Sequence, residues 1–373
     1  MGIHEDYMNR ALELAKGGWG TTNPNPLVGA VIVKNEEIIA EGYHEVFGGA
    51  HAEVAAINNA KQDVKGGTLY VNLEPCSHYG RTPPCAEAII KAGISKVIVA
   101  MEDPNPKVSG RGIGMLRKAG IETIVGVLEQ EARKLNEIFI KYIVRKRPFV
   151  IMKTAMTLDG KITSACGDSK WISGESSRHH VHITRNRVAA IMVGVNTVLE
   201  DNPCLTTRLG LKTCKDPVRI IIDSKGRIPI ESRVINVESA AGVILATTSA
   251  IDSEKEKQLT DKGVNILKLG KPDGQVDLAR LMDELYKLEI DSLLLEGGGG
   301  LNAAALNSGI VDKVMFYIAP KFIGGRDAKT PIEGEGIKFM KDAIKLYDLS
   351  ISRFDQDVLI EGYVKGELCL QEL

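Results

Sequence analysis

The sequence predicts a chain of two α/β domains. Three observations support this: its length, its alternation of strand-like with helix-like segments, and a proline-marked break near the middle. A chain of 373 residues is long enough for two domains of ordinary size. Strand patterns alternate with helix patterns in both halves, which is typical of layered α/β folds. The basic stretch 145–147 leads into Pro148, and a proline cannot continue a helix. We therefore expect one domain over residues 1–147 and another over residues 148–373.

The first half is predicted to form a helix, a strand hairpin, and then alternating helices and strands. We expect helices at about residues 4–17, 51–60, 85–92 and 112–119, and from about 129 onward. We expect strands at residues 27–33, 38–41, 68–73, 96–101 and 121–127. The polar turn at 35–37 separates the first two strands and indicates the hairpin.

The second half repeats this alternation. Its apolar strand patterns lie at residues 149–154, 189–194, 218–223, 241–247, 264–268, 292–295 and 313–319. Helical patterns lie between several of them. This half is therefore also α/β, and it is large enough for a core of its own.

Composition and charge exclude several classes of protein. Hydrophobic residues make up 44% and charged residues 25%, as in ordinary globular proteins. The net charge is −1 and neither half is basic, which disfavours broad contact with nucleic acid and favours a small-molecule substrate. No apolar run reaches the roughly 18 residues needed to span a membrane, and the N-terminus lacks the pattern of a signal peptide. We expect a cytoplasmic protein. In that compartment six cysteines would remain thiols, so clustered ones favour metal binding.

One histidine and two cysteines have the pattern of a catalytic zinc site. His51 begins a helix pattern two residues before Glu53, Cys76 follows a strand, and Cys85 opens the next helix. Such a tripod leaves the fourth position of tetrahedral zinc to water. On a regular helix Glu53 would point about 200° away from His51, so it can serve as a proton shuttle only if His51 precedes the helix. The order H-x-E, then P-C, then C is the signature of zinc deaminases.

Residues 23–105 resemble the cytidine deaminase-like superfamily. Eight residues separate Cys76 and Cys85 in PCSHYGRTPPC, in place of the common P-C-x-x-C. With NPNPLVGAVIV upstream and MEDPNPKVSGRG downstream, this segment is similar to the deaminase half of the bifunctional riboflavin-biosynthesis deaminase-reductases. The resemblance implies a three-layer α/β/α domain with one Zn²⁺ that deaminates 2,5-diamino-6-ribosylamino-4(3H)-pyrimidinone 5′-phosphate. It implies that the following residues surround the pyrimidine and its phosphate: Asn25, His44, His78, Arg81, Asp103 and Asn105.

The most suggestive feature of the second half is a glycine loop at 297–300, between a strand and a helix pattern. Such a loop lets backbone N–H groups approach a phosphate, although it is not the G-x-G-x-x-G fingerprint and a flexible turn is the alternative. KTAMTLDGKI, GDSKWIS, VGVNTVLEDNPCLTTR and EGGGGLNAA resemble the reductase half of the same family, whose fold is dihydrofolate reductase-like. The resemblance implies hydride transfer from NADPH to the ribosyl group of the deaminated product, giving 5-amino-6-(5-phosphoribitylamino)uracil.

The same resemblance implies which residues hold the two ligands of the second domain. The NADPH contacts are Met156, Trp171, Thr197, Asp201, Ser224, Gly298, Gly299 and Gly300. The substrate contacts are Lys153, Ser169, Arg185, Leu205, Arg208 and Glu296. Asp201 is also a candidate polar group near the hydride-transfer centre, and a homo-oligomer is expected.

Other interpretations remain open. A zinc deaminase of tRNA adenosine or of a cytosine nucleotide would leave the residues after 147 unexplained. In a non-catalytic, zinc-stabilised binding module, the metal would support folding alone. A closed structural zinc site would need a fourth ligand, for which His44 and His78 are candidates.

Two further side-chain groups in the second half are ambiguous. His179, His180 and His182 do not share one helix face, so we expect a solvated helix and no second metal site. Lys225 or Arg227 would either meet the 2′-phosphate of NADPH or be solvated.

Overall fold

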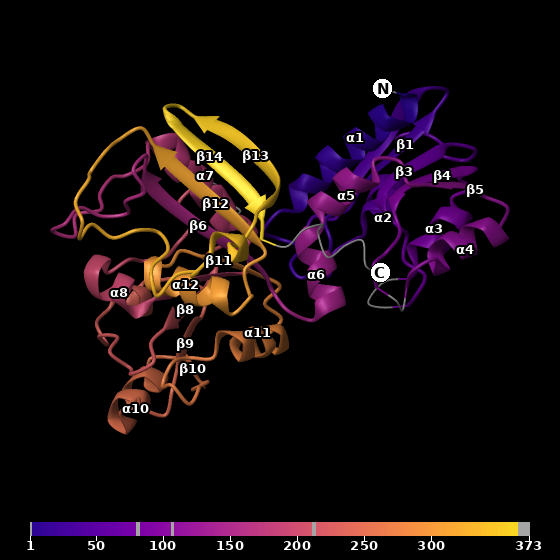
Figure 1. Ribbon diagram of the computed structural model, residues 1–373. Coiled ribbons are helices and arrows are strands. Elements are labelled where there is room, and N and C mark those ends of the chain that lie inside the picture. The colour runs from indigo at the N-terminus through magenta and orange to yellow at the C-terminus, as the bar shows by residue number, and fades with distance from the viewer. Residues whose placement is uncertain (1, 80–82, 106–107, 211–213, 365–373) are drawn as a thin grey trace. The chain divides into compact units, whose positions relative to one another are not determined.

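The computed structural model describes residues 2–79, 83–105, 108–210 and 214–364. It divides the chain into two compact units, Met1–Lys146 and Arg147–Leu373. Each unit has its own sheet (Figure 1). The division lies beside Pro148.

The first unit is built on a five-stranded sheet with the order β2-β1-β3-β4-β5. Its strands are β1 (Gly29–Lys34), β2 (Glu37–Tyr43), β3 (Thr68–Leu73), β4 (Lys96–Met101) and β5 (Glu122–Val125). β1 is antiparallel to β2 and β3, whereas β3, β4 and β5 are parallel. The residues of β1, β3 and β4 are almost all buried, so both faces of the sheet are covered.

Helices form the two outer layers of this unit. They are α1 (Ile3–Ala15), α2 (Ala52–Asn59), α3 (Cys85–Lys91), α4 (Arg111–Lys118), α5 (Glu129–Leu135) and α6 (Glu137–Arg145). α1 and α5 contact each other and the sheet, while α2, α3 and α4 contact one another in sequence (Figure 1). The unit has the three-layer architecture that was predicted for it.

The single helix expected from residue 129 is broken at Asn136, which lies between α5 and α6. Asn136 is buried, and its amide group accepts the N–H of Leu27 at 2.8 Å and donates to the Leu27 carbonyl at 3.0 Å. The break therefore follows from a contact between distant parts of the chain. The helical periodicity of the sequence does not predict it.

The second unit contains a nine-stranded sheet with the order β10-β9-β8-β7-β11-β6-β12-β14-β13. The strands are β6 (Phe149–Thr157), β7 (Ala190–Gly194), β8 (Val218–Ile222), β9 (Val243–Thr247), β10 (Val264–Lys268), β11 (Ser292–Leu295), β12 (Lys313–Ala319), β13 (Tyr347–Phe354) and β14 (Asp357–Tyr363). All pairs from β10 to β12 are parallel, and β14 and β13 add an antiparallel edge.

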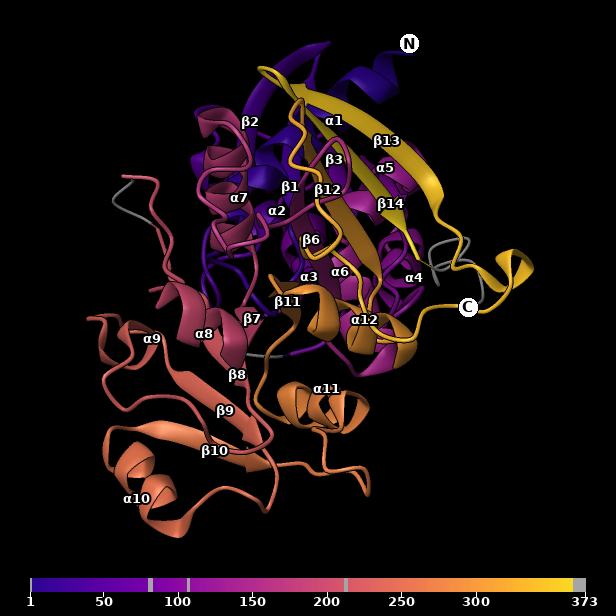
Figure 2. The same ribbon diagram turned by 60° about the vertical axis from the view of Figure 1, so that its left-hand side comes forward.

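Helices cover both faces of this sheet as well. They are α7 (Glu175–Arg187), α8 (Val195–Asp201), α9 (Arg233–Asn236), α10 (Ser253–Asp261), α11 (Leu278–Lys287) and α12 (Gly299–Asn307). β7 contributes Ala190 and Met192 to the core shared with α11 and α12, and Ile191 and Val193 to the core shared with α8 and α10. This alternation is the two-residue period of a strand buried on both faces. Figure 2 shows α10 beside β10, which it contacts at the sheet edge.

The hairpin of β13 and β14 was missed by the sequence analysis. Tyr347, Leu349 and Ile351 alternate with polar residues ahead of a turn at Asp355, and this alternation was the available signal. The hairpin also explains why the prediction of a solvated histidine helix is wrong for His180. The His180 ring stacks on Phe354 at 4.6 Å between centroids, and its Nδ1 lies 2.7 Å from the Tyr317 hydroxyl.

No helix within the described residues is both long enough and apolar enough to cross a membrane.

Candidate active sites

The first candidate site is a group of three metal-ligating atoms in the first unit. The Nδ1 of His51 lies 3.1 Å from the Cys85 Sγ and 3.5 Å from the Cys76 Sγ, and all three donor atoms lie within 4.8 Å of one another. Tetrahedral zinc with Zn–S of about 2.3 Å and Zn–N of about 2.0 Å separates neighbouring donors by about 3.5 Å. The donor set and its spacing therefore fit a zinc ion.

Local structure brings these three residues together. His51 is the N-cap of α2, Cys76 follows β3, and Cys85 is the first residue of α3. The N–H of Cys85 donates to the Cys76 Sγ at 3.2 Å. Unpaired N–H groups at helix N-termini favour thiolates.

The pKa values of the two cysteine thiols are shifted in opposite directions. Hydrogen bonding by the Cys85 thiol, with a further contribution from His51, lowers the pKa of Cys76 to about 4. The same hydrogen bond to Cys76 raises the pKa of Cys85. Zinc ligation requires both as thiolates, so metal binding at this site releases a proton.

Glu53 is the buried acid of this site, with 2% of its surface exposed. Burial is the main cause that raises its pKa to about 7, and the neighbouring Cys76 thiolate adds to the effect. Because His51 lies outside the helix as its N-cap, the geometric condition for Glu53 to act as a shuttle is met. A carboxyl group with a pKa near neutrality can both accept and return a proton.

His44 and Asn25 form a hydrogen-bonded pair near the metal-ligating atoms. The Asn25 amide nitrogen lies 3.1 Å from the His44 Nε2, and the His44 Nδ1 lies 2.9 Å from the Ala50 carbonyl. The His44 and His51 rings meet edge to face at 5.7 Å between centroids. Within the described residues, neither His44 nor His78 joins the three-donor group, which leaves its fourth position free of a protein ligand.

Asp103 and Asn105 follow β4. The Asn105 N–H donates to the Asp103 Oδ1 at 2.8 Å. Burial is the main cause that raises the pKa of Asp103 to about 6, while the hydrogen bond from the Asn105 N–H opposes the shift. Arg81, another predicted substrate contact, lies outside the described residues.

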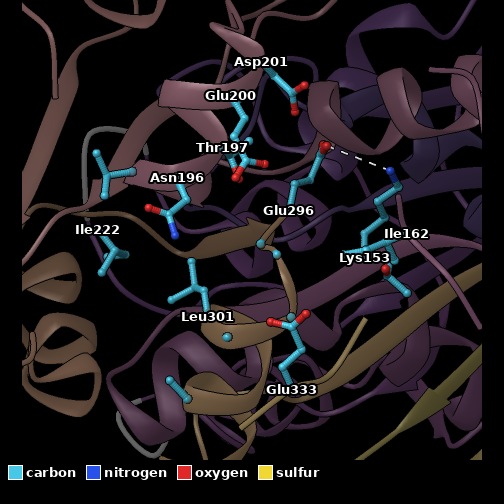
Figure 3. Close-up of a pocket in the computed structure, with 18 of the residues that line it drawn as sticks. Lys153, Ile162, Asn196, Thr197, Glu200, Asp201, Ile222, Glu296, Leu301 and Glu333 are labelled. Carbon is cyan, nitrogen blue, oxygen red and sulfur yellow. Dashed lines mark ion pairs between the residues drawn. The ribbon is translucent and has the colours of Figure 1, made fainter. Parts of the chain in front are cut away.

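The second candidate site is a cavity of about 1320 Å³ in the second unit (Figure 3). It lies at the carboxyl ends of β7, β8 and β11, where parallel sheets bind their ligands. Twelve predicted site residues line it: Lys153, Ser169, Trp171, Arg185, Thr197, Asp201, Arg208, Ser224, Glu296, Gly298, Gly299 and Gly300. Met156 and Leu205 are not among the lining residues, and Leu205 is buried in the apolar core beside α8.

A buried cluster of charges lies at one side of this cavity. Arg185 donates two hydrogen bonds to the Glu296 carboxylate at 2.8 and 2.9 Å and a third to the Thr206 carbonyl. The Lys153 Nζ points toward Glu296 at 4.0 Å (Figure 3). Burial alone would raise the pKa of Glu296, but the charges of Arg185 and Lys153 lower this pKa to about 2. Arg185 thus already has a carboxylate partner.

The glycine loop forms another part of the cavity lining. Gly298 is the N-cap of α12, so the glycine loop presents the N-terminus of that helix. Lys271, Gln275 and Glu333 also line the cavity and were missed by the sequence analysis. Their loops are distant in sequence from the glycine loop and carry no motif, so no sequence signal marked them.

Comparisons with known proteins identify the domain that contains each candidate site. Residues 1–101 match the cytidine and deoxycytidylate deaminase zinc-binding region, and residues 148–360 match the RibD C-terminal domain. The chain is 51% identical to the riboflavin biosynthesis protein RibD of Actinobacillus pleuropneumoniae, over 97% of this chain and 96% of that protein. It is 44% identical to the RibD of Aquifex aeolicus, over 96% and 98% of the two chains.

Solved structures give the same result. RibD of Acinetobacter baumannii superposes with a TM-score of 0.86 at 37% identity, over 97% of this chain and 98% of that one. A Thermotoga maritima protein described as a diaminohydroxyphosphoribosylaminopyrimidine deaminase/5-amino-6-(5-phosphoribosylamino)uracil reductase gives 0.84 at 40% identity, with the same coverage. These matches confirm the expected pairing of a cytidine deaminase-like domain with a reductase domain. The chain belongs to the RibD family, the bifunctional deaminase-reductases of riboflavin biosynthesis.

Proposed function

We propose that residues 1–147 deaminate 2,5-diamino-6-ribosylamino-4(3H)-pyrimidinone 5′-phosphate and that residues 148–373 reduce the product with NADPH. The final product is 5-amino-6-(5-phosphoribitylamino)uracil. The three-donor group with buried Glu53 beside it carries the first half of this proposal. The cavity with a glycine loop at a helix N-terminus supports the second half.

In the deaminase, His51, Cys76 and Cys85 hold the zinc ion. The bound ion supplies Lewis-acid activation of water. Glu53 takes a proton from the attacking water and gives it to the ring nitrogen. It then moves a second proton, from the hydroxyl group now on the ring carbon, to the amine, which leaves as ammonia while the carbonyl forms. The following residues orient the pyrimidine and its phosphate: Asn25, His44, His78, Arg81, Asp103 and Asn105.

In the reductase, the protein orients two ligands and the bound NADPH supplies the hydride. Gly298, Gly299 and Gly300 hold the pyrophosphate at the N-terminus of α12. The remaining proposed cofactor contacts are Met156, Trp171, Thr197, Asp201 and Ser224, and Asp201 lies near the hydride-transfer centre. The proposed substrate contacts are Lys153, Ser169, Arg185, Leu205, Arg208 and Glu296.

One incubation tests this function. Zinc-loaded protein is mixed with the diaminopyrimidine phosphate, with and without NADPH, and ammonia and NADPH are followed separately. Ammonia should form without NADPH, and NADPH should be consumed only after deamination. Removing zinc with a chelator should stop ammonia release and leave NADPH binding intact. Ammonia from a cytosine nucleotide or from tRNA, and none from the diaminopyrimidine, would favour the alternative deaminase.

Arg227 is proposed to read the 2′-phosphate of NADPH. It lines the cavity close to Ser224, and its Nη2 donates to the Asn196 Oδ1 at 2.9 Å. Arg227→Gln should raise the Kd for NADPH about tenfold and leave the Kd for NADH unchanged, because only NADPH carries a phosphate on the ribose 2′ oxygen. Titration by NADPH and NADH fluorescence measures both constants. Arg233→Gln, at an exposed position outside the cavity lining, is the control. An equal loss of affinity for both cofactors would contradict this role.

The protein is further proposed to act in the cytoplasm on this small molecule, without nucleic acid or membrane partners, and as a homo-oligomer. A reducing compartment suits cysteine ligands to a metal. The oligomer is supported by β13, which forms the sheet edge and exposes Leu349 at 59% and Ile351 at 72%. An exposed apolar edge strand is suited to pairing with another chain.

Ile351→Glu should raise the dissociation constant of the oligomer at least about a hundredfold, because it places charge in an apolar interface. Sedimentation equilibrium measures this change. Leu288→Glu, which replaces an exposed leucine at the end of α11, is the matched control and should leave the mass unchanged. An oligomer as stable with Ile351→Glu as with wild type would exclude β13 as the interface.

A further inference from the structure

A buried carboxylate beside the metal ligands has no role in the chemistry described so far. Glu74 follows β3 directly and is 3% exposed. Its Oε2 accepts the N–H groups of Asp103 at 3.1 Å and Gly110 at 2.9 Å. Its Oε1 accepts those of Gly112 at 2.9 Å and Ile113 at 3.2 Å. One side chain therefore accepts N–H groups from Asp103, two residues after β4, and from the N-cap and first turn of α4.

Helix α4 has no capping side chain of its own. Its N-cap is Gly110, which has a φ of 72°. Gly112 and Ile113 are the N2 and N3 positions, whose N–H groups a cap normally accepts. Glu74 supplies that acceptor from a different element, and its negative charge is favourable at a helix N-terminus. A Cβ on Gly112 would lie 1.9 Å from the Pro75 carbonyl oxygen, so the helix directly contacts the backbone that leads to the ligand Cys76.

The same carboxylate binds Asp103 directly and Asn105 through Asp103, and these two residues are proposed substrate contacts. Glu74 holds the Asp103 N–H, the Asp103 Oδ1 accepts the Asn105 N–H at 2.8 Å, and the Asn105 carbonyl accepts the Val108 N–H at 2.8 Å. We propose that Glu74 is a positioning residue for deamination, which fixes Asp103 and Asn105 relative to the metal ligand Cys76. This inference rests on the deamination proposed for residues 1–147.

The test compares wild type with Glu74→Gln as the full, zinc-loaded chain. Glutamine replaces one accepting oxygen by an NH₂ group, so in either orientation two of the four N–H groups lose their acceptor. KM for the diaminopyrimidine phosphate should rise at least about tenfold, with kcat changed less than about threefold and zinc content unchanged. A purely structural role would instead lower the active fraction, which lowers the apparent kcat and leaves KM unchanged.

Two further variants complete the test. Glu102→Gln alters an exposed neighbour in the same segment and should leave KM unchanged. Glu74→Asp keeps both oxygens on a shorter side chain, so it should raise KM by less than Glu74→Gln, and it carries the test if the glutamine variant does not fold. An unchanged KM in a folded, zinc-loaded Glu74 variant would overturn the positioning role, as would failure of both variants to fold. A wild-type protein that releases no ammonia would instead overturn the proposed function.

Discussion

Replacing Glu53 by glutamine is expected to slow deamination by about a thousandfold, because glutamine fills the same space but cannot carry the proton. Glu53 is 2% exposed and its pKa is raised to about 7, mainly by burial. Its carboxyl group can therefore exchange a proton near neutral pH. Zinc content, melting temperature and NADPH binding should stay at wild-type values. Ammonia release at saturating substrate measures the effect.

Glu131→Gln is the matched control for this experiment. Glu131 is an exposed residue of α5, and its substitution should leave every rate unchanged. A Glu53→Gln protein that retains zinc and deaminates at the wild-type rate would remove Glu53 from the mechanism. If wild type and Glu53→Gln both bind zinc and neither has any activity, the non-catalytic zinc module becomes the better description of the first unit.

Replacing Glu296 by glutamine is expected to lower the free energy of unfolding of the second unit by about 3 kcal/mol, because two buried cations lose their counter-ion. The side chains of Arg185 and Glu296 are only 12% and 14% exposed. Burial lowers the pKa of Lys153, and the negative charge of Glu296 opposes this shift. The drop in the pKa of Glu296 from an ordinary 4.5 to about 2 corresponds to a similar energy of about 3 kcal/mol.

The effect of Glu296→Gln should depend on pH in a defined direction. A carboxyl group whose pKa is lower in the folded state stabilises the protein above its ordinary pKa, and the contribution disappears as the pH falls through the folded-state value. The difference between wild type and variant should therefore be complete above about pH 5 and shrink toward about pH 2, as expected for the pKa values of Glu296. Calorimetry of the full chain across this range measures it.

Glu256→Gln serves as the control because it removes a comparable ion pair from the surface of the same unit. Glu256 and Lys268 lie 2.7 Å apart, but their side chains are 31% and 46% exposed. Exposed pairs contribute about 1 kcal/mol or less. Equal losses from the two variants, or a loss for Glu296→Gln that does not change with pH, would contradict the role assigned to the buried pair.

The zinc ligands could be predicted from the sequence because each lies in a short motif at the end of a helix or after a strand. His51 is the N-cap of one helix, Cys85 is the first residue of another, and Cys76 follows a strand. Each position follows from a short motif. The role of Glu74 was not predicted, because its four partners follow a later strand. The sequence shows a glutamate before P-C, but it does not show which backbone N–H groups will donate to that carboxylate.

The reductase site shows the same division. The glycine loop at 297–300 was predicted from its motif. Lys271, Gln275 and Glu333 also line the cavity, but only the folding of the sheet brings them there. Arg185 was expected at the substrate, and the structure gives it Glu296 as a partner. The sequence predicts that both residues belong to this site, but it does not predict that they form a buried ion pair.

By itself the sequence determined the identities and order of the zinc ligands, most of the parallel strands and the α/β class of both halves, because periodicity and turn chemistry act over a few residues. Tertiary structure alone decided the break at Asn136, the packing of His180 under the β13–β14 hairpin, and the contacts of Glu74 and Glu296. Each of these depends on side chains that meet across long stretches of chain. The free energy of such a contact arises from burial and pairing in the folded state, which no local pattern encodes.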